Sequence, residues 1–137
     1  MAAHANIGQF LGVAPKSEFD LTRIVENGVP TENLQRLRDA GLTFTEMSEI
    51  IISPRTLKHR RSRGEPLSAE EADRAVRVAR IIAQAQSVFA DREGAFEWLR
   101  TPDDRLDSRT PLSMLRTESG GRLIEEMLGQ IDEGVYP

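Results

Sequence analysis

Residues 43–63 read TFTEMSEIIISPRTLKHRRSR, and they predict two short helices joined by a tight turn. Thr43 and Glu46 form a capping box, in which the Glu side chain reaches back to the amide of the cap residue. Ser53 and Pro54 then supply a second cap, with proline at the first helical position, where its missing N–H costs nothing. Two short helices over about residues 43–50 and 54–63, the second one cationic, have the outline of a helix-turn-helix.

The second helix is strongly basic. Five of the nine residues from Arg55 to Arg63 are Lys or Arg, His59 lies among them, and none is acidic. With Leu57 facing the core, a step of about 100° per residue turns Arg55 and His59 outward. Outward arginines suit guanine edges, and flanking cations suit phosphates. We therefore predict a DNA-binding face made of Thr45, Arg55, Thr56, Lys58, His59, Arg60, Arg61 and Arg63.

The same pattern also fits a solvated basic helix that nearby acids neutralise, namely Glu46, Glu49 and Glu65. His59 is typical of a surface donor rather than a metal ligand, and His4 is too isolated to be its partner. We expect no metal site.

Helix signals continue on both sides, and no segment predicts a strand. Ser17 and Thr31 begin two helices that end at Gly28 and Gly41. A second capping box at Ser68–Glu71 starts the longest helix, which extends to about Phe89 and is apolar on two sides. Further helical segments follow, about residues 91–99, a single turn after Thr110-Pro111, and a last helix between Thr117 and Gly134. The expected fold class is all-α, organised around the long central helix.

Composition places the chain among soluble globular proteins. It has 137 residues, 29% of them charged, and no cysteine, which excludes disulfides and thiolate chemistry. Its net charge of −4 is uneven, because residues 81–137 carry 6 cations against 11 acids. The apolar runs are too short to cross a membrane, and the N-terminus lacks the features of a signal peptide. We expect a cytoplasmic protein without a membrane partner.

Catalysis has little support in the sequence. The chain has no HExxH motif, no Ser-His-acid arrangement and no Cys nucleophile. Asp103, Asp104 and Asp107 cluster in one segment, and a solvated turn explains them more simply than acid–base chemistry does. Gly120-Gly121 suits either an anion at a helix N-terminus or close helix packing. We predict no enzyme, no catalytic residue, no cofactor and no small-molecule substrate.

Several stretches together resemble one known family. Residues 52–60 and 67–74 look like the Xre-type antitoxin helix-turn-helix. Val88-Phe89, Trp98-Leu99, Thr110-Pro111-Leu112, Thr117–Gly120 and Ile131–Tyr136 resemble the toxin-binding domain of Xre/MbcA/ParS antitoxins. The resemblance covers about residues 40–137. It departs from the family at Ser108-Arg109, where glycine is usual.

The resemblance implies a domain organisation and a function. An N-terminal tail (residues 1–17), whose order the sequence leaves open, precedes an Xre/Cro-like helix-turn-helix domain (18–84). The central helix joins this domain to a small helical toxin-binding domain (85–137). The implied protein is a homodimeric antitoxin of a type II toxin–antitoxin pair. It blocks the active site of a RES-type toxin, which consumes NAD⁺, and represses their shared operon by binding operator DNA.

The C-terminal residues are the predicted toxin contact. They are Glu133, Gly134, Val135, Tyr136 and Pro137. Tyr136 offers a ring for stacking, and the terminal carboxylate could meet cations in a concave site. From the residues alone, a frayed terminus is the simpler interpretation, and the family resemblance favours insertion into the toxin. The alternative function is a stand-alone helix-turn-helix transcriptional or partition-type regulator without an enzyme partner.

Overall fold

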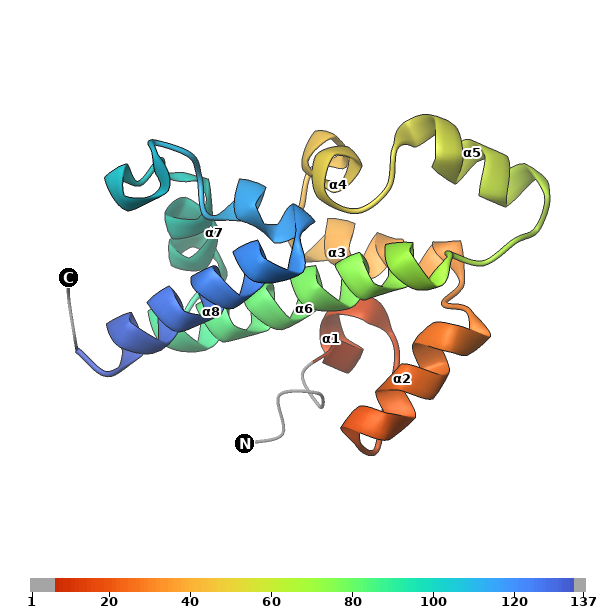
Figure 1. The fold of residues 1–137 in the computed structure, drawn as a ribbon, viewed down its shortest axis with the longest axis horizontal. Coiled ribbons are helices and arrows are strands. Elements are labelled where there is room, and N and C mark those ends of the chain that lie inside the picture. The colour runs from red at the N-terminus through yellow and green to blue at the C-terminus, as the bar shows by residue number, and fades with distance from the viewer. Residues whose placement is uncertain (1–6, 135–137) are drawn as a thin grey trace.

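The computed structural model describes residues 7–134 as an all-helical fold, which confirms the predicted fold class. Figure 1 shows one long helix crossing the molecule with shorter helices packed around it. Within the described residues, the only extended pairing is an isolated bridge between Asp103 and Arg109. In chain order the helices are α1 (Ile7–Leu11), α2 (Glu18–Asn27), η2 (Thr31–Asn33), α3 (Leu34–Ala40), α4 (Phe44–Ile50), α5 (Pro54–Ser62), α6 (Ala69–Phe89), α7 (Arg92–Arg100), η3 (Asp104–Leu106), η4 (Leu112–Arg116) and α8 (Glu118–Asp132).

The long helix α6 is the centre of the fold. It begins at a capping box, because Ser68 Oγ accepts from the Glu71 amide and the Glu71 carboxylate accepts from the Ser68 amide. Both of its predicted apolar rows are buried, apart from Val88 and Phe89 near its end, which are partly buried. It packs against α1 and α2 as well as α7, α8 and η4. One continuous helix therefore contributes to the core of both halves of the chain.

Helix α1 was not predicted from the sequence, and its residues belong to the predicted N-terminal tail. In the structure Ile7 and Leu11 are fully buried and Phe10 nearly so. The helix packs against α3 and α6. Burial of three large apolar side chains, each worth about 1.5–3 kcal/mol, holds a helix too short to form alone. Helix α1 is thus part of the core.

The pair Gly120-Gly121 lies in the first turn of α8, where it allows close packing. A Cβ on Gly120 would collide with the Met114 carbonyl oxygen, and one on Gly121 would lie 2.7 Å from Arg77 Cδ. Both glycines are buried. Of the two interpretations that the sequence left open, the contacts of the described residues support close packing.

Candidate functional site

The predicted helix-turn-helix forms, with its three-residue turn fixed on the inside. Ile51 and Ile52 of the turn are 2% and 4% exposed, and Leu57 on α5 is 2% exposed. Arg74 of α6 donates from Nε to the Ile51 carbonyl oxygen at 2.8 Å. Sequence reasoning missed this role of Arg74, because the two residues lie 23 positions apart. The turn is therefore anchored by apolar burial and by a hydrogen bond from the central helix.

The start of α5 is shaped by its cap. Ser53 Oγ accepts from the Thr56 amide at 3.2 Å and donates to Thr56 Oγ1 at 2.9 Å. Thr56 is half-buried, and its hydroxyl oxygen is engaged at the cap while remaining able to donate. Pro54 occupies the first turn, as predicted. The cap orders the end of α5 that a helix-turn-helix brings to DNA.

Arg60 differs from the other cations of α5, because acidic side chains of the protein bind its guanidinium. It donates from Nε and Nη2 to the two carboxylate oxygens of Glu71 at 2.9 and 3.1 Å, and from Nη1 to Glu65 at 3.2 Å. The Arg60 side chain is 24% exposed and that of Glu71 is 8% exposed. This fork fixes the orientation of α5 relative to the start of α6. We predicted Arg60 as a DNA contact, and the structure gives it this internal set of partners.

The pKa values of this pair follow from the contact. Hydrogen bonding to Glu71 raises the pKa of Arg60. Burial alone would raise the pKa of Glu71, but hydrogen bonds from Arg60 and from the Ser68 backbone outweigh it, so the pKa of Glu71 is lowered. The ionised carboxylate therefore stabilises the folded state.

A pH dependence of stability follows from Glu71. Its contribution is complete above the pKa of an unfolded Glu, about 4.3, and is lost as the pH falls through the lower folded value. We expect Glu71→Gln to lower the melting temperature at pH 7 by a few degrees and to flatten the loss of stability between about pH 5 and pH 3. Thermal unfolding followed by circular dichroism measures both effects. Glu70→Gln, at an exposed neighbour, is the control and should leave both unchanged; equal effects of the two substitutions would contradict the assignment.

The outer face of α5 carries cations that the protein itself does not neutralise. The side chains of Arg55, Lys58 and Arg61 are exposed, and none of them has a hydrogen bond or ion pair with another residue in the range 7–134. Arg63 Nη1 lies 3.5 Å from His59 Nε2, and both residues are exposed. Thr45 is exposed on α4. The exposed basic residues Arg55, Lys58, His59, Arg61 and Arg63 are together called the basic face of α5.

None of the three acids that could have neutralised this face pairs with it, and two of them bind other arginines. Glu46 accepts from Arg100 of α7 at 2.7 Å, and Glu65 accepts from Arg60. Burial alone would raise the pKa of Glu46. The hydrogen bonds from Arg100 and from the Thr43 backbone outweigh burial, so the pKa of Glu46 is lowered. Glu49 is exposed without an ion pair among the described residues. The basic face of α5 is thus available to an anionic partner.

The C-terminal half is built on α7, η4 and α8. Phe89 and Trp98 pack with ring centroids 5.9 Å apart, and both are partly buried. At the end of α8, Glu133 and Gly134 are exposed. Val135, Tyr136 and Pro137, the other predicted toxin-binding residues, lie outside the described residues. His4 also lies outside them.

The acidic loop after α7 has the character of a structural turn. Asp103 caps η3 by accepting from the Arg105 amide at 2.8 Å, and its carboxylate also accepts from the Arg105 guanidinium. The hydrogen bond from the Arg105 side chain is the main cause of the lowered pKa of Asp103. Asp104 and Asp107 are exposed. A carboxylate held ionised at the surface does not have the raised pKa of a general acid.

From Ile7 to Gly134, no group of three His, Asp or Glu side chains could hold a metal ion. No helix in the same range is both long and apolar enough to cross a bilayer.

Comparison with known proteins agrees with this geometry. The family model of the antitoxin Xre-like helix-turn-helix domain matches residues 20–80, and that of the antitoxin Xre/MbcA/ParS C-terminal toxin-binding domain matches residues 84–134. The chain is 38% identical over 118 residues to antitoxin Xre of Pseudomonas putida, which is 86% of this chain and 74% of that protein. It is 33% identical over 86 residues to antitoxin Xre of Yersinia enterocolitica, covering 62% and 58% of the two chains. It is also 28% identical over 129 residues to antitoxin Xre of Photorhabdus laumondii, covering 91% and 86%. With an Xre-like helix-turn-helix followed by an Xre/MbcA/ParS toxin-binding domain, the chain belongs to the Xre antitoxin family.

Proposed function

We propose that this protein is a cytoplasmic, non-enzymatic antitoxin that blocks the active site of a RES-type, NAD⁺-consuming toxin and represses their shared operon as a homodimer. Residues 18–84 bind the operator, and residues 85–137 bind the toxin. The observation that carries the DNA-binding part is the basic face of α5, where the exposed side chains of Arg55, Lys58 and Arg61 have no hydrogen bond or ion pair within the described residues. Exposed arginines on a helix that enters the major groove suit guanine edges, and lysines suit phosphates.

The toxin-binding part rests on the matched C-terminal domain and on the end of α8. Residues 84–134 match the toxin-binding domain, and α8 ends in exposed Glu133 and Gly134 immediately before the last three residues. Residues 81–137 carry the excess of acids, which favours a toxin surface that is basic. We assign Glu133 to Pro137 to the contact with the toxin active site.

Co-expression with the product of the adjacent gene tests this function. We expect the neighbour alone to stop growth and drain cellular NAD⁺, and this protein to restore both through a stable complex. Deletion of Val135–Pro137 should weaken the rescue while operator binding stays within about twofold, since α5 lies in the other domain.

A deletion that rescues growth as well as the full chain would remove the tail from the inhibitory contact. A harmless neighbour that forms no complex would contradict the antitoxin function. It would instead favour a stand-alone DNA-binding regulator.

A further inference from the structure

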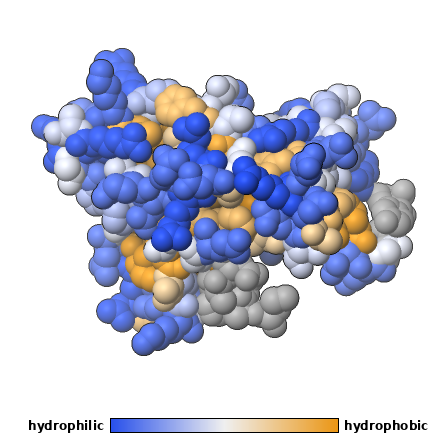
Figure 2. All heavy atoms as spheres, turned by 180° about the vertical axis from the view of Figure 1, so that it is seen from behind, coloured by the Kyte–Doolittle hydropathy of each residue, from blue (hydrophilic) through white to orange (hydrophobic). Residues whose placement is uncertain are grey.

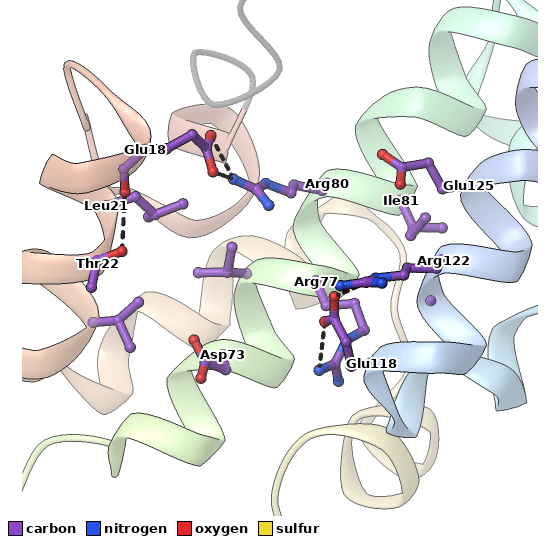
Figure 3. A pocket seen from close by; sticks show the side chains of 13 residues that line it. Glu18, Leu21, Thr22, Asp73, Arg77, Arg80, Ile81, Glu118, Arg122 and Glu125 are labelled. Atoms are coloured by element: carbon purple, nitrogen blue, oxygen red, sulfur yellow. Dashed lines mark hydrogen bonds and ion pairs between the residues drawn. The ribbon is translucent and has the colours of Figure 1, made fainter.

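A groove of about 440 Å³ lies between α2 and α8, with α6 beneath it. Figure 3 shows α2 and α8 on either side, with side chains of both directed toward α6. Four of the lining residues are aliphatic: Leu21, Val25, Val76 and Ile81. The other nine lining residues are polar, charged or glycine, and the groove is open to solvent. It has room for one large aromatic side chain, which would contact the aliphatic residues of the lining.

The rim of the groove carries both signs of charge. Arg80 pairs with Glu18 of α2, and Arg77 with Glu118 of α8 at 3.4 Å (Figure 3). The carboxylates of Asp73 and Glu125 also line the groove, and neither has a hydrogen bond or ion pair within residues 7–134. An incoming cation could pair with either of them. The rim thus presents acids in excess of the cations that the protein supplies.

The outer side of α2 carries a side chain of the matching kind. Phe19 is 73% exposed, more than any other large hydrophobic residue in the described range. Arg23 lies one helical turn further on the same side, is exposed, and has no partner among the described residues. From behind, hydrophobic colour interrupts the hydrophilic surface at the end of the molecule where α2 lies (Figure 2). The exposed ring of Phe19 could contact the aliphatic residues of the groove, and the unpaired guanidinium of Arg23 could bind its unpaired carboxylates.

We propose that this surface binds a second copy of the same chain, an inference that rests on the proposed homodimeric repressor and names its interface. Phe19 of each copy enters the groove of the other, and Arg23 meets the Asp73 and Glu125 carboxylates across the interface. The groove and Phe19 lie on one surface of the protein. Glu18 and Thr22 of α2 line the groove, and Phe19 lies next to them on the same helix. A two-fold axis needs such a self-complementary patch, and a toxin would need only one half of it. The second copy is therefore the occupant that uses both halves.

The first test is the mass of the full-length protein in solution, measured by light scattering after gel filtration. We expect the wild type at about 10 μM to have twice the chain mass of 15.3 kDa. Phe19→Asp should give the single-chain mass with an unchanged circular dichroism spectrum, because Phe19 is mostly exposed. Phe44→Asp, at an exposed phenylalanine of α4 away from the groove, is the matched control and should remain dimeric. A monomeric wild type, or a folded Phe19→Asp variant that stays dimeric, would overturn the proposal.

A charge exchange tests the pairing itself. Arg23→Glu should raise the dimer dissociation constant at least 10-fold, and adding Asp73→Lys with Glu125→Lys should restore most of the loss. Failure of the three substitutions together to restore dimers would overturn the charge pairing. A Phe19→Asp variant that remains dimeric but no longer binds the toxin would assign the groove to the toxin instead. The co-expression experiment has a separate readout, so a lack of growth rescue by a dimeric wild type would count against the antitoxin function and not against this interface.

Discussion

The Arg55→Glu, Arg61→Glu double variant should bind operator DNA at least about 100-fold more weakly than the wild type, because each bidentate arginine contact is worth about 1–3 kcal/mol and reversal adds repulsion. Both side chains are exposed on α5, and neither makes a hydrogen bond or ion pair with another described residue that its loss would break. Folding and toxin neutralisation should therefore be unchanged. Fluorescence anisotropy with a fragment of the operon promoter, at a stated salt concentration, measures the loss.

The matched control reverses the same number of charges elsewhere. Arg36→Glu with Arg92→Glu changes the net charge by the same amount, at exposed residues of α3 and α7. We expect less than a threefold change in DNA affinity from this pair. Equal losses from the two double variants would mean that net charge, and not the basic face of α5, governs binding. Loss of neutralisation by a folded Arg55, Arg61 variant would contradict the division of labour between the two domains.

Gly120→Ala is expected to have the largest effect on stability, lowering the free energy of unfolding by about 2–3 kcal/mol. The added methyl group would overlap the Met114 carbonyl oxygen and lie 3.0 Å from Thr117 Oγ1. Backbone atoms of η4 cannot yield as the end of a flexible side chain can. Either the start of α8 or η4 must move, and both belong to the toxin-binding domain. Urea denaturation followed by circular dichroism measures the change.

Gly129→Ala in the same helix is the control. Apart from the adjacent residues and the backbone of α8 itself, no heavy atom lies within 4 Å of a Cβ placed on Gly129. Replacing a helical glycine by alanine should then stabilise the protein by about 0.5–1 kcal/mol. Opposite signs at the two positions would show that packing against η4 is the reason for Gly120. A stable Gly120→Ala variant would show that this contact is not required.

Local signals predicted much of the fold. Both capping boxes, at Thr43 and Ser68, form with the two hydrogen bonds expected of them. The proline start of α5 and the cap at Thr117 were also correct. Each of these signals acts over three or four residues, so a short stretch of sequence is enough to predict where the helix begins. Helix α1 packs against α3 and α6, which are distant in sequence, and no local pattern indicates these contacts.

Helical periodicity was less reliable for individual side chains. A spacing of three residues puts Phe44 on the same side of α4 as the buried Met47, but Phe44 is 42% exposed and the Arg38 guanidinium lies over its ring, 5.6 Å from the centroid. Periodicity also placed Arg60 with the other cations of α5, although Glu71, eleven residues later, holds it. A helical wheel shows the direction of a side chain but not what meets it. The basic face of α5 could be outlined from sequence, whereas its internal anchor required the structure.

The joint between the two matched domains is the middle of α6, not a flexible connection. The helix-turn-helix match ends at residue 80, and the toxin-binding match begins at residue 84. Both positions lie inside α6, which continues without interruption from Ala69 to Phe89. Proteases prefer exposed loop tips and extended segments, and a helix packed on both sides offers them neither. Within the described residues, the segment that joins the two matched domains therefore offers no ready cleavage point. The proposed repression and neutralisation are expected to be lost together on degradation, so one lifetime would govern both.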